Sequence, residues 1–254
     1  MIKLSVVIPV FNEQHRIEPL LKTVDAATRS WRGAREIIVV DDGSTDGTGA
    51  ALAAAARDGI PVTVLCHERN RGKGAALRRG VLASHGALVL LTDADLATPI
   101  GELRALLARI AEGADVAIGS RGVRGSRILV PQSRFRQWSG HVFNRIVRLI
   151  LLPDIADTQC GFKLFRGPAA RALFAHSVID GYTIDVEILR LAAAAGLTIA
   201  EVPVTWSHME GSKVRVLRDG VRMGRELLGI WNRLGMRARV RPELTLHPGR
   251  VLPR

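Results

Sequence analysis

The sequence predicts an α/β fold in which a mostly parallel sheet is covered by helices on both faces. Short apolar runs rich in valine, isoleucine and leucine alternate with helix-length stretches over the first 120 of the 254 residues. The apolar runs are continuous rather than alternating with polar residues, which is typical of strands buried on both faces. The pattern therefore indicates a Rossmann-like arrangement, with functional residues beyond the carboxyl ends of the strands.

The individual elements follow from these runs and from the residues that interrupt them. Strands are expected at residues 4–10, 36–40, 62–66, 87–91, 116–119 and 199–204. Helices are expected near residues 18–30, 47–57, from 72 onward, 99–111, 132–152, 184–195 and 216–234. Glycines separate several runs, and Thr98 with Pro99 marks one helix start. Residues 236–254 are basic and contain prolines, so we expect a flexible tail.

Size and composition favour one domain with a substantial core. Hydrophobic residues make up 47% of the chain. Cys66 and Cys160 lack C-x-x-C spacing and indicate reduced thiols. The first strand begins too soon after Met1 for an export signal, and no apolar run approaches the roughly 18 to 20 residues of a spanning helix. We therefore expect a cytoplasmic protein without a membrane span.

Positive charge is concentrated in the second half of the chain. The formal net charge is +12, and residues 120–153 carry seven arginines and no acid. After Gly211, eleven Lys or Arg stand against three acids. This asymmetry indicates an anionic partner, which is a nucleic acid, an anionic bilayer or a phosphorylated substrate. An arginine-rich composition with solvated faces is the alternative.

Two aspartates follow the second strand, in V-V-D-D-G-S-T-D-G-T at residues 39–48. Asp41 and Asp42 suit an acidic pair that accepts hydrogen bonds from ribose hydroxyls or a base edge. Capping of the next helix by Asp42 or Ser44, with Asp46 in the turn, explains the same residues. The segment alone leaves both interpretations open.

A second pair of aspartates follows the fourth strand, in A-L-V-L-L-T-D-A-D-L. In the bend after a strand, carboxylates at i and i+2 can converge on one hard cation that also binds phosphate oxygens. The alternative is two surface aspartates ahead of a helix, but two acids at a buried strand end repel each other unless a cation or base compensates them. Asp93 and Asp95 therefore indicate a site for Mg²⁺ or Mn²⁺.

The segment N-R-G-K-G at residues 70–74 opens the third helix. Its glycines allow close backbone approach, and the N–H groups of a helix start together with Lys73 suit an anion. The spacing differs from that of a Walker motif. An exposed lysine in an ordinary glycine turn is the alternative.

Residues 132–152 predict a basic amphipathic helix. Its apolar stripe consists of Phe135, Trp138, Val142, Ile146 and Leu149. The arginines off the stripe are Arg134, Arg145 and Arg148. Such a helix is typical of proteins that lie on an anionic membrane surface. Packing of the stripe on the core of the protein, or in the seam of a homodimer, is the alternative.

Several separated segments resemble the family 2 glycosyltransferases of GT-A fold. In the first half these are S-V-V-I-P-V-F-N-E, V-V-D-D-G-S-T-D-G-T, N-R-G-K-G and T-D-A-D-L. In the second half, D-T-Q-C-G-F-K-L-F, D-V-E-I-L, E-V-P-V-T-W and G-S-K-V resemble the polyprenyl (dolichyl) phosphate sugar synthases, and most of all the dolichyl-phosphate β-glucosyltransferases. The resemblance covers about residues 4 to 230. It implies one GT-A domain over residues 1–235, with a nucleotide-sugar-binding half at 1–120 and an acceptor- and membrane-facing half at 121–235.

Carried over position by position, the resemblance implies roles for individual residues. The nucleotide sugar would be bound by Pro9, Phe11, Glu13, Asp42, Lys73, Asp93 and Ala94. Arg121 and Lys213 match positions that contact donor or acceptor phosphates. On electrostatic grounds, we expect the acceptor phosphate to be bound by Arg121, Arg127, Arg134 or Lys213. Asp93 and Asp95 would meet the metal, and the catalytic residues would be Asp95, Asp157, Arg121 and Lys213. Whether Asp157 is a base or orients the acceptor stays open.

One position departs from the pattern. Many mannosyl relatives carry a glutamine where this sequence has Ala97. The third metal contact is therefore open, and the departure favours the glucosyl branch.

The resemblance implies inverting transfer of a hexose from a nucleoside diphosphate sugar to a polyprenyl monophosphate. The expected donor is UDP-glucose. A GDP-mannose-using enzyme and a soluble transferase to a hydroxyl acceptor are the alternatives among enzymes. A basic nucleic-acid-binding module is the non-enzyme alternative, and the single tyrosine, Tyr182, speaks against it because such modules stack bases on aromatic rings. We expect no nucleic-acid partner, and peripheral association with the cytoplasmic face of an anionic membrane.

Overall fold

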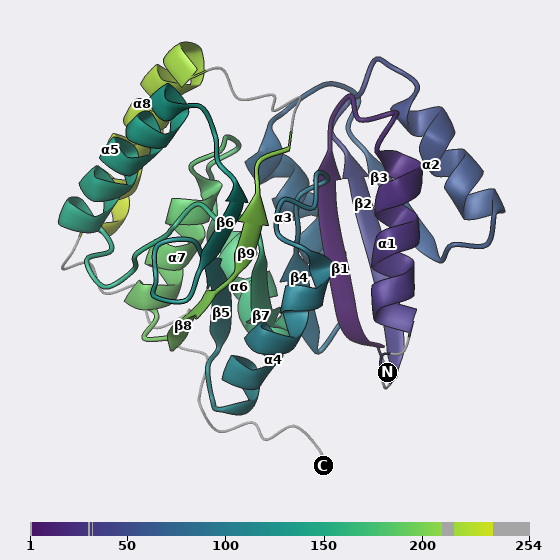
Figure 1. The fold of residues 1–254 in the computed structure, drawn as a ribbon, viewed down its shortest axis with the longest axis horizontal. Helices are drawn as coiled ribbons and strands as arrows, with labels where there is room; N and C mark the ends of the chain where they lie inside the picture. Colours follow the sequence, from purple (N-terminus) through teal and green to yellow (C-terminus); the bar gives the residue numbers. More distant parts are fainter. Residues whose placement is uncertain (1, 30, 32, 210–215, 236–254) are drawn as a thin grey trace.

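A computed structural model describes residues 2–29, 31, 33–209 and 216–235, and Figure 1 shows its fold. The strands are β1 (Ile2–Val10), β2 (Ala34–Asp41), β3 (Val62–Cys66), β4 (Leu88–Leu91), β5 (Val116–Ser120), β6 (Arg127–Val130), β7 (Lys163–Arg166), β8 (Ile199–Pro203) and β9 (Thr205–Ser207). The helices are α1 (Ile17–Arg29), α2 (Thr48–Arg57), α3 (Lys73–Leu82), the short 3-10 helix η1 (Ile100–Glu102), α4 (Leu103–Ala111), α5 (Arg134–Ile150), α6 (Gly167–His176), α7 (Ile184–Ala194) and α8 (Val216–Leu234).

The main sheet has seven strands in the order β3-β2-β1-β4-β7-β5-β8. Six of them are parallel, and β7 is antiparallel to both of its neighbours, β4 and β5. The predicted strands and helices are present, and their ends lie within two residues of the expected positions. The sequence pattern does not predict β6, β7, β9 or α6. The pattern misses the central strand β7 because Lys163 interrupts the short apolar run F-K-L-F. That lysine is nevertheless only 1% exposed.

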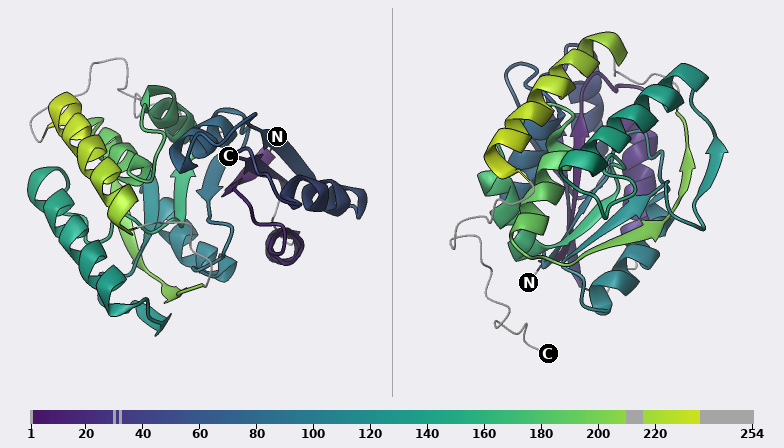
Figure 2. Two further views of the ribbon diagram at one scale, coloured as in Figure 1. Left: turned by 90° about the horizontal axis from the view of Figure 1, so that it is seen from above. Right: turned by 90° about the vertical axis from the view of Figure 1, so that its left-hand side faces the viewer.

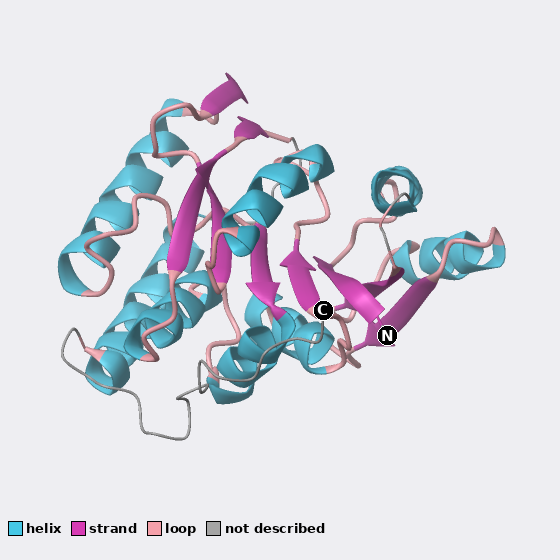
Figure 3. Ribbon diagram, turned by 90° about the horizontal axis from the view of Figure 1, so that it is seen from below, coloured by secondary structure: helices cyan, strands magenta, loops and turns pink. Residues whose placement is uncertain are grey.

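Helices cover both faces of the sheet, as Figure 3 shows from below. One core lies between the sheet and α1, α2 and α4, and the other lies between the sheet and α3, α5, α6, α7 and α8. In β1, Val7 faces one core while Val6 and Ile8 face the other. This two-sided burial explains why the strands read as continuous apolar runs.

Helices α5 and α8 lie side by side at one end of the molecule (Figures 1 and 2). Helix α5 meets the core through the fully buried Val147, with Phe143 and Ile150 beside it. The predicted apolar stripe is exposed instead, from 39% at Val142 to 68% at Leu149. The expectation that the stripe could pack on the core of the protein is therefore wrong. None of the helices in the described part of the chain has the length and apolarity needed to span a bilayer.

Candidate functional site

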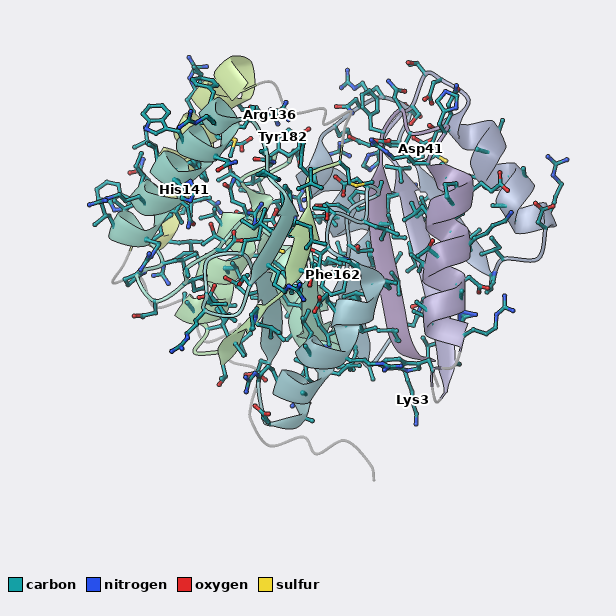
Figure 4. All side chains as sticks on the ribbon, in the orientation of Figure 1. Lys3, Asp41, Arg136, His141, Phe162 and Tyr182 are labelled. Carbon is teal, nitrogen blue, oxygen red and sulfur yellow. The ribbon has the colours of Figure 1, made fainter. Side chains whose placement is uncertain are left out.

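The carboxyl ends of the parallel strands meet at the upper edge of the molecule in Figure 4, where Asp41 is labelled at the end of β2. The loops after β1 and β2 are joined there: the Asn12 amide donates to Ser44 Oγ at 2.8 Å, and the Thr45 amide donates to Asn12 Oδ1 at 2.8 Å. Asn12 adopts a positive φ of 54°, a conformation that asparagine tolerates better than most residues. The first two strand-end loops therefore form one fixed surface.

Asp41 and Asp42 are both buried, and each accepts hydrogen bonds from protein groups. Asp41 Oδ1 accepts from the Ser44 amide at 2.9 Å. Asp42 accepts from His67 Nδ1 at 2.7 Å and from the amides of Arg71 and Gly72 at 3.0 and 2.7 Å. Asp42 thus fixes the loop that leads into α3, and its role toward a nucleotide stays a prediction.

The start of α3 packs against the segment 179–181 rather than facing open space. The Gly74 amide donates to the Asp180 carbonyl at 2.8 Å. Gly72 has a φ of +113°, and a Cβ there would lie 2.3 Å from the same carbonyl oxygen. Only glycine fits this close approach, which positions Lys73 at the first turn of the helix. The anion that the sequence suggests for this helix start would have to share its amides with a protein carbonyl.

Lys73 belongs to a chain of four alternating charges. Its Nζ lies 2.8 Å from Asp93 Oδ1 and 3.5 Å from Asp185 Oδ2, and Lys163 Nζ lies 2.5 Å from Asp185 Oδ1. Desolvation opposes the charge of Lys73, but Asp185 and Asp93 outweigh it and raise the pKa of Lys73. Desolvation likewise opposes ionisation of Asp93, but Lys73 lowers the pKa of Asp93. Both groups are therefore charged at neutral pH.

The turn after β4 brings Asp93 and Asp95 to one cleft. The Leu96 amide donates to the Asp93 carbonyl at 3.2 Å, and Leu96 has a positive φ of 48°. A left-handed leucine costs about 1 to 3 kcal/mol, a strain that occurs most often at functional sites. The Ala97 amide donates to Asp95 Oδ1 at 3.0 Å. Burial, followed by repulsion from Asp93, raises the pKa of Asp95.

Gly161 allows this turn to pack against the segment before β7. A Cβ on Gly161 would lie 1.9 Å from Asp93 Oδ2, closer than any side chain permits. The cleft itself is lined by Thr92, Asp93, Asp95, Ala97, Thr98, Gly161, Phe162 and Trp206, and Figure 4 labels Phe162 in the middle of the sheet. The absence of a side chain at residue 161 is thus part of the site.

Arg121 and Asp157 form a two-pronged ion pair beside the cleft. Arg121 Nε and Nη2 donate to the two oxygens of Asp157 at 2.7 and 2.9 Å, and the Arg121 amide donates to the same carboxylate at 3.0 Å. Desolvation opposes ionisation, but these hydrogen bonds lower the pKa of Asp157, and Asp157 raises the pKa of Arg121 despite its burial. The guanidinium carbon lies 5.4 Å from the ring centre of Trp206. Arg121 is therefore a fixed cation with one face on an aromatic ring.

A divalent cation suits the aspartate pair with two protein ligands. Carboxylate oxygens are the ligands that Mg²⁺ and Mn²⁺ prefer. Burial raises the pKa of Asp95 first and repulsion from Asp93 second, and a bound cation would offset that repulsion. Within the described residues, no group of three or more His, Cys, Asp or Glu could hold a metal ion. Ala97 offers only a methyl group, and its carbonyl accepts the Ser207 amide at 2.9 Å. The other ligands would come from a substrate and water.

The other predicted positions are scattered relative to the cleft. Arg127 and Arg134 are exposed, on β6 and at the start of α5. Pro9, Phe11 and Ala94 are half-buried, and Glu13 pairs with Arg16 at 2.7 Å. Lys213 and the predicted tail at 236–254 lie outside the described residues. The structure thus brings together Lys73, Asp93, Asp95, Arg121 and Asp157.

Sequence reasoning assigned no role to Lys163, Asp185 and Gly161. A signal for the first two exists, since each is a charged residue inside an apolar run, in F-K-L-F and I-D-V-E-I-L. Charged residues are rarely fully buried unless they are paired, so two such residues predict each other as partners. Both cysteines are free, as the sequence predicts.

Comparisons with known proteins identify the family. The profile of Glycosyl transferase family 2 matches residues 5–174. The chain is 38% identical over 247 residues to the dolichyl-phosphate beta-glucosyltransferase of Drosophila melanogaster, which covers 91% of this chain and 75% of the relative. It is 35% identical over 241 residues to the Homo sapiens protein of the same name, with 90% and 74% covered. It is 32% identical to Glycosyltransferase AglD of Haloferax volcanii, over 99% of this chain and 40% of that protein.

The fold matches solved structures of glucosyl-3-phosphoglycerate synthase from Mycobacterium tuberculosis. One of them, a complex with Mn²⁺, UDP and glucosyl-3-phosphoglycerate, superimposes with a TM-score of 0.65 at 22% identity and covers 91% of this chain and 80% of that one. A likeness at this identity shows the fold alone, and it confirms the predicted GT-A α/β architecture. Together with the sequence matches, it establishes that this chain belongs to glycosyl transferase family 2 and is a glycosyltransferase.

Proposed function

We propose that the chain transfers glucose from UDP-glucose to the phosphate of a polyprenyl monophosphate, with inversion at the anomeric carbon. An acceptor phosphate oxygen would bond to the anomeric carbon as the bond to the diphosphate oxygen breaks, and the nucleoside diphosphate would leave. A single displacement inverts the configuration. The observation that carries the proposal is that an acidic pair lines a cleft whose Trp206 also packs against a fixed guanidinium.

The acidic pair suits the donor side of this reaction. Asp93 and Asp95 would hold a divalent cation, which supplies positive charge to the leaving diphosphate. The name of the Mycobacterium tuberculosis structures includes Mn²⁺ with UDP-glucose, which supports the same cofactor and donor here. Gly161 supports the pair because its missing side chain leaves room for the Asp93 carboxylate.

The Arg121–Asp157 pair suits the acceptor side. Phosphate is ionised near neutral pH, so the nucleophile has no proton that a strong base must remove. Both Asp157 oxygens accept from Arg121, and their lowered pKa disfavours a role as proton acceptor. We therefore assign Asp157 to orienting Arg121, and Arg121 to drawing the acceptor phosphate into line. Arg127, Arg134 and Lys213 stay predicted as further phosphate ligands.

The exposed apolar face at the end of the molecule suits a lipid acceptor. On α5 and α8, Trp138, Leu149, Leu228 and Trp231 are at least half exposed. Monomeric soluble proteins rarely expose so many large apolar side chains on adjacent elements. The arginines of α5 flank this face, and each basic residue near an anionic leaflet adds on the order of 1 kcal/mol. We propose that this face lies on the cytoplasmic leaflet, where a polyprenyl tail stays in lipid.

The test is a donor screen with Mg²⁺ or Mn²⁺ and a short-chain polyprenyl phosphate, read as lipid-linked sugar. We expect UDP-glucose to give product and GDP-mannose to give little. Preference for GDP-mannose would show that the donor is GDP-mannose rather than UDP-glucose. Transfer only to a hydroxyl acceptor would overturn the proposal that the acceptor is a lipid phosphate. Arg121→Lys keeps the charge but loses the two-pronged geometry. It should raise the KM for the acceptor more than the KM for the donor.

A soluble transferase acting on a small acceptor is the second candidate. The fold likeness to a synthase whose name specifies phosphoglycerate favours it. The exposed apolar face disfavours it, because a small water-soluble acceptor gives that surface no partner. Offering phosphoglycerate and short-chain polyprenyl phosphate in parallel separates the two candidates.

A further inference from the structure

An ammonium group of the protein lies where the proposed cation would act. Lys73 Nζ is 2.8 Å from Asp93 Oδ1, and its side chain is only 16% exposed. Asp93 is one of the two carboxylates that we propose as metal ligands. A lysine and a divalent cation would therefore compete for the same negative charge.

The charges around this carboxylate nearly balance without a metal. The cluster contains the carboxylates of Asp93, Asp95 and Asp185 and the ammonium groups of Lys73 and Lys163, which leaves one negative charge. The nearby guanidinium groups of Arg121 and Arg16 are each paired with another carboxylate, Asp157 and Glu13. A free divalent cation would thus meet a weakly negative site and a lysine beside it.

A second carboxylate, that of Asp185, could pair with Lys73 if a cation displaced the lysine from Asp93. Asp185 Oδ2 is 3.5 Å from Lys73 Nζ, within reach of a small side-chain movement. Asp185 cannot follow, because Lys163, which is 1% exposed, holds its other oxygen at 2.5 Å. The close packing of Gly72 and Gly74 on residues 179–181 fixes the helix turn that carries Lys73. The movement is therefore confined to the lysine side chain.

From this arrangement we infer that Lys73 is an internal counter-ion that makes the site take the cation together with a nucleoside diphosphate and bind the free cation poorly. The diphosphate brings negative charge that both the cation and the displaced lysine can use. Asp185 is a positioning residue that receives Lys73. The inference rests on the proposed donor and metal. It adds a reason why the metal would bind only weakly without the nucleoside diphosphate.

The test measures Mn²⁺ binding by electron paramagnetic resonance, with and without UDP, in the wild type and in Lys73→Met. In the wild type, UDP should tighten Mn²⁺ binding by about tenfold or more, within the usual range of coupling between two sites. Lys73→Met should bind free Mn²⁺ more tightly, and UDP should then tighten it by less than about threefold. The control Arg79→Met removes an exposed cation from the same helix and should change neither value.

A second variant moves the result in the opposite direction. Asp185→Asn removes one negative charge and the alternative acceptor, so free Mn²⁺ should bind more weakly than to the wild type. Thermal melting of each variant reports whether it is folded, and Lys73→Arg should restore the coupling if Lys73→Met loses it.

The outcomes separate the inference from the proposed function. If the wild type binds Mn²⁺ with UDP but Lys73→Met leaves the affinity for free Mn²⁺ unchanged, the inference is overturned and the proposed function stands. If the wild type binds no Mn²⁺ even with UDP, both are overturned.

Discussion

Helices α1 and α5 have similar patterns and opposite surroundings. Both are amphipathic, but in α1 the apolar residues Ile17, Leu21 and Val24 are fully buried. In α5 the apolar residues Trp138 and Leu149 are 64% and 68% exposed. Periodicity thus reveals that a helix has an apolar face, but it cannot reveal whether the protein, a membrane or a second chain covers that face.

Charged residues also differ in burial between α5 and the rest of the molecule. At the carboxyl edge of the sheet, Lys163, Asp185 and Asp157 are at least nine-tenths buried, and each is paired. On α5, Arg134, Arg145 and Arg148 are exposed, and so are the apolar residues of the stripe. One region therefore depends on tight internal fit, while the other presents charged and apolar side chains at the surface. The two regions should respond differently to matched substitutions.

The largest effect is expected at the tight region, for Asp95→Asn. The variant keeps the shape of the side chain and removes its charge, so transfer should fall by about 100- to 1,000-fold, as for loss of one preorganised electrostatic group. The melting temperature should not fall, because burial and Asp93 disfavour this charge in the folded protein. Turnover of the sugar donor and thermal melting are the measurements. Undiminished transfer would contradict the proposal that Asp95 holds a metal ion.

Matched leucine truncations compare the stability of the two helices. Leu21→Ala in α1 should lower the free energy of unfolding by about 2 to 5 kcal/mol, because it leaves a cavity in a closed core. Leu149→Ala in α5 should change it by about 0.5 kcal/mol or less, since the side chain is already exposed. Denaturant unfolding measures both. A large loss in Leu149→Ala would mean that α5 is covered in solution, as in a homodimer.

Matched glycine substitutions compare the space in the two regions. Gly161→Ala puts a Cβ 1.9 Å from Asp93 Oδ2 and should lower kcat by about tenfold, because small displacements at a reacting centre have large effects. Gly140→Ala in α5 meets nothing within 4 Å and should stabilise the helix by about 0.5 to 1 kcal/mol. Steady-state kinetics and melting distinguish the two. Equal activities would mean that the turn after β4 adjusts freely.

The smallest expected effect concerns vesicle binding. The double variant Trp138→Ser and Leu149→Ser should bind anionic vesicles about tenfold more weakly, in line with the apolar area lost, while turnover of a short water-soluble acceptor stays unchanged. Leu82→Ser removes an exposed leucine from α3 and should bind like the wild type. Unchanged vesicle binding together with a loss of dimer in sedimentation would assign the face to a homodimer seam instead.

Much of the fold can be predicted from the sequence because its strands are buried on both faces. Their continuous apolar runs leave little ambiguity, and the predicted strand at residues 116–119 coincides with β5, in which every residue is buried. The long helix at 216–234 was equally clear. Strand β7 was not, because a lysine inside an apolar run looks like a surface residue until its partner Asp185 is known.

The site is predictable only as far as residues that follow strands. Asp93, Asp95 and Arg121 stand directly after β4 and β5, and the fold itself places them at one edge. Lys163 and Gly161 reach the same place through tertiary contacts that no local pattern encodes. The hydrogen bond between His67 and Asp42 also depends on contacts between separate loops.

The antiparallel strand β7 has a consequence for how the chain reaches its native state. Strands β3, β2, β1 and β4 pair with one another, and all of them precede residue 92. Strand β5 follows them in the sequence but has no partner until Lys163–Arg166 fills the gap beside β4. On a ribosome, the first four strands can assemble while β5 must wait for about 45 further residues, the separation of the two strands in the sequence. The basic helix α5 is made during that interval, before the sheet that supports it is closed.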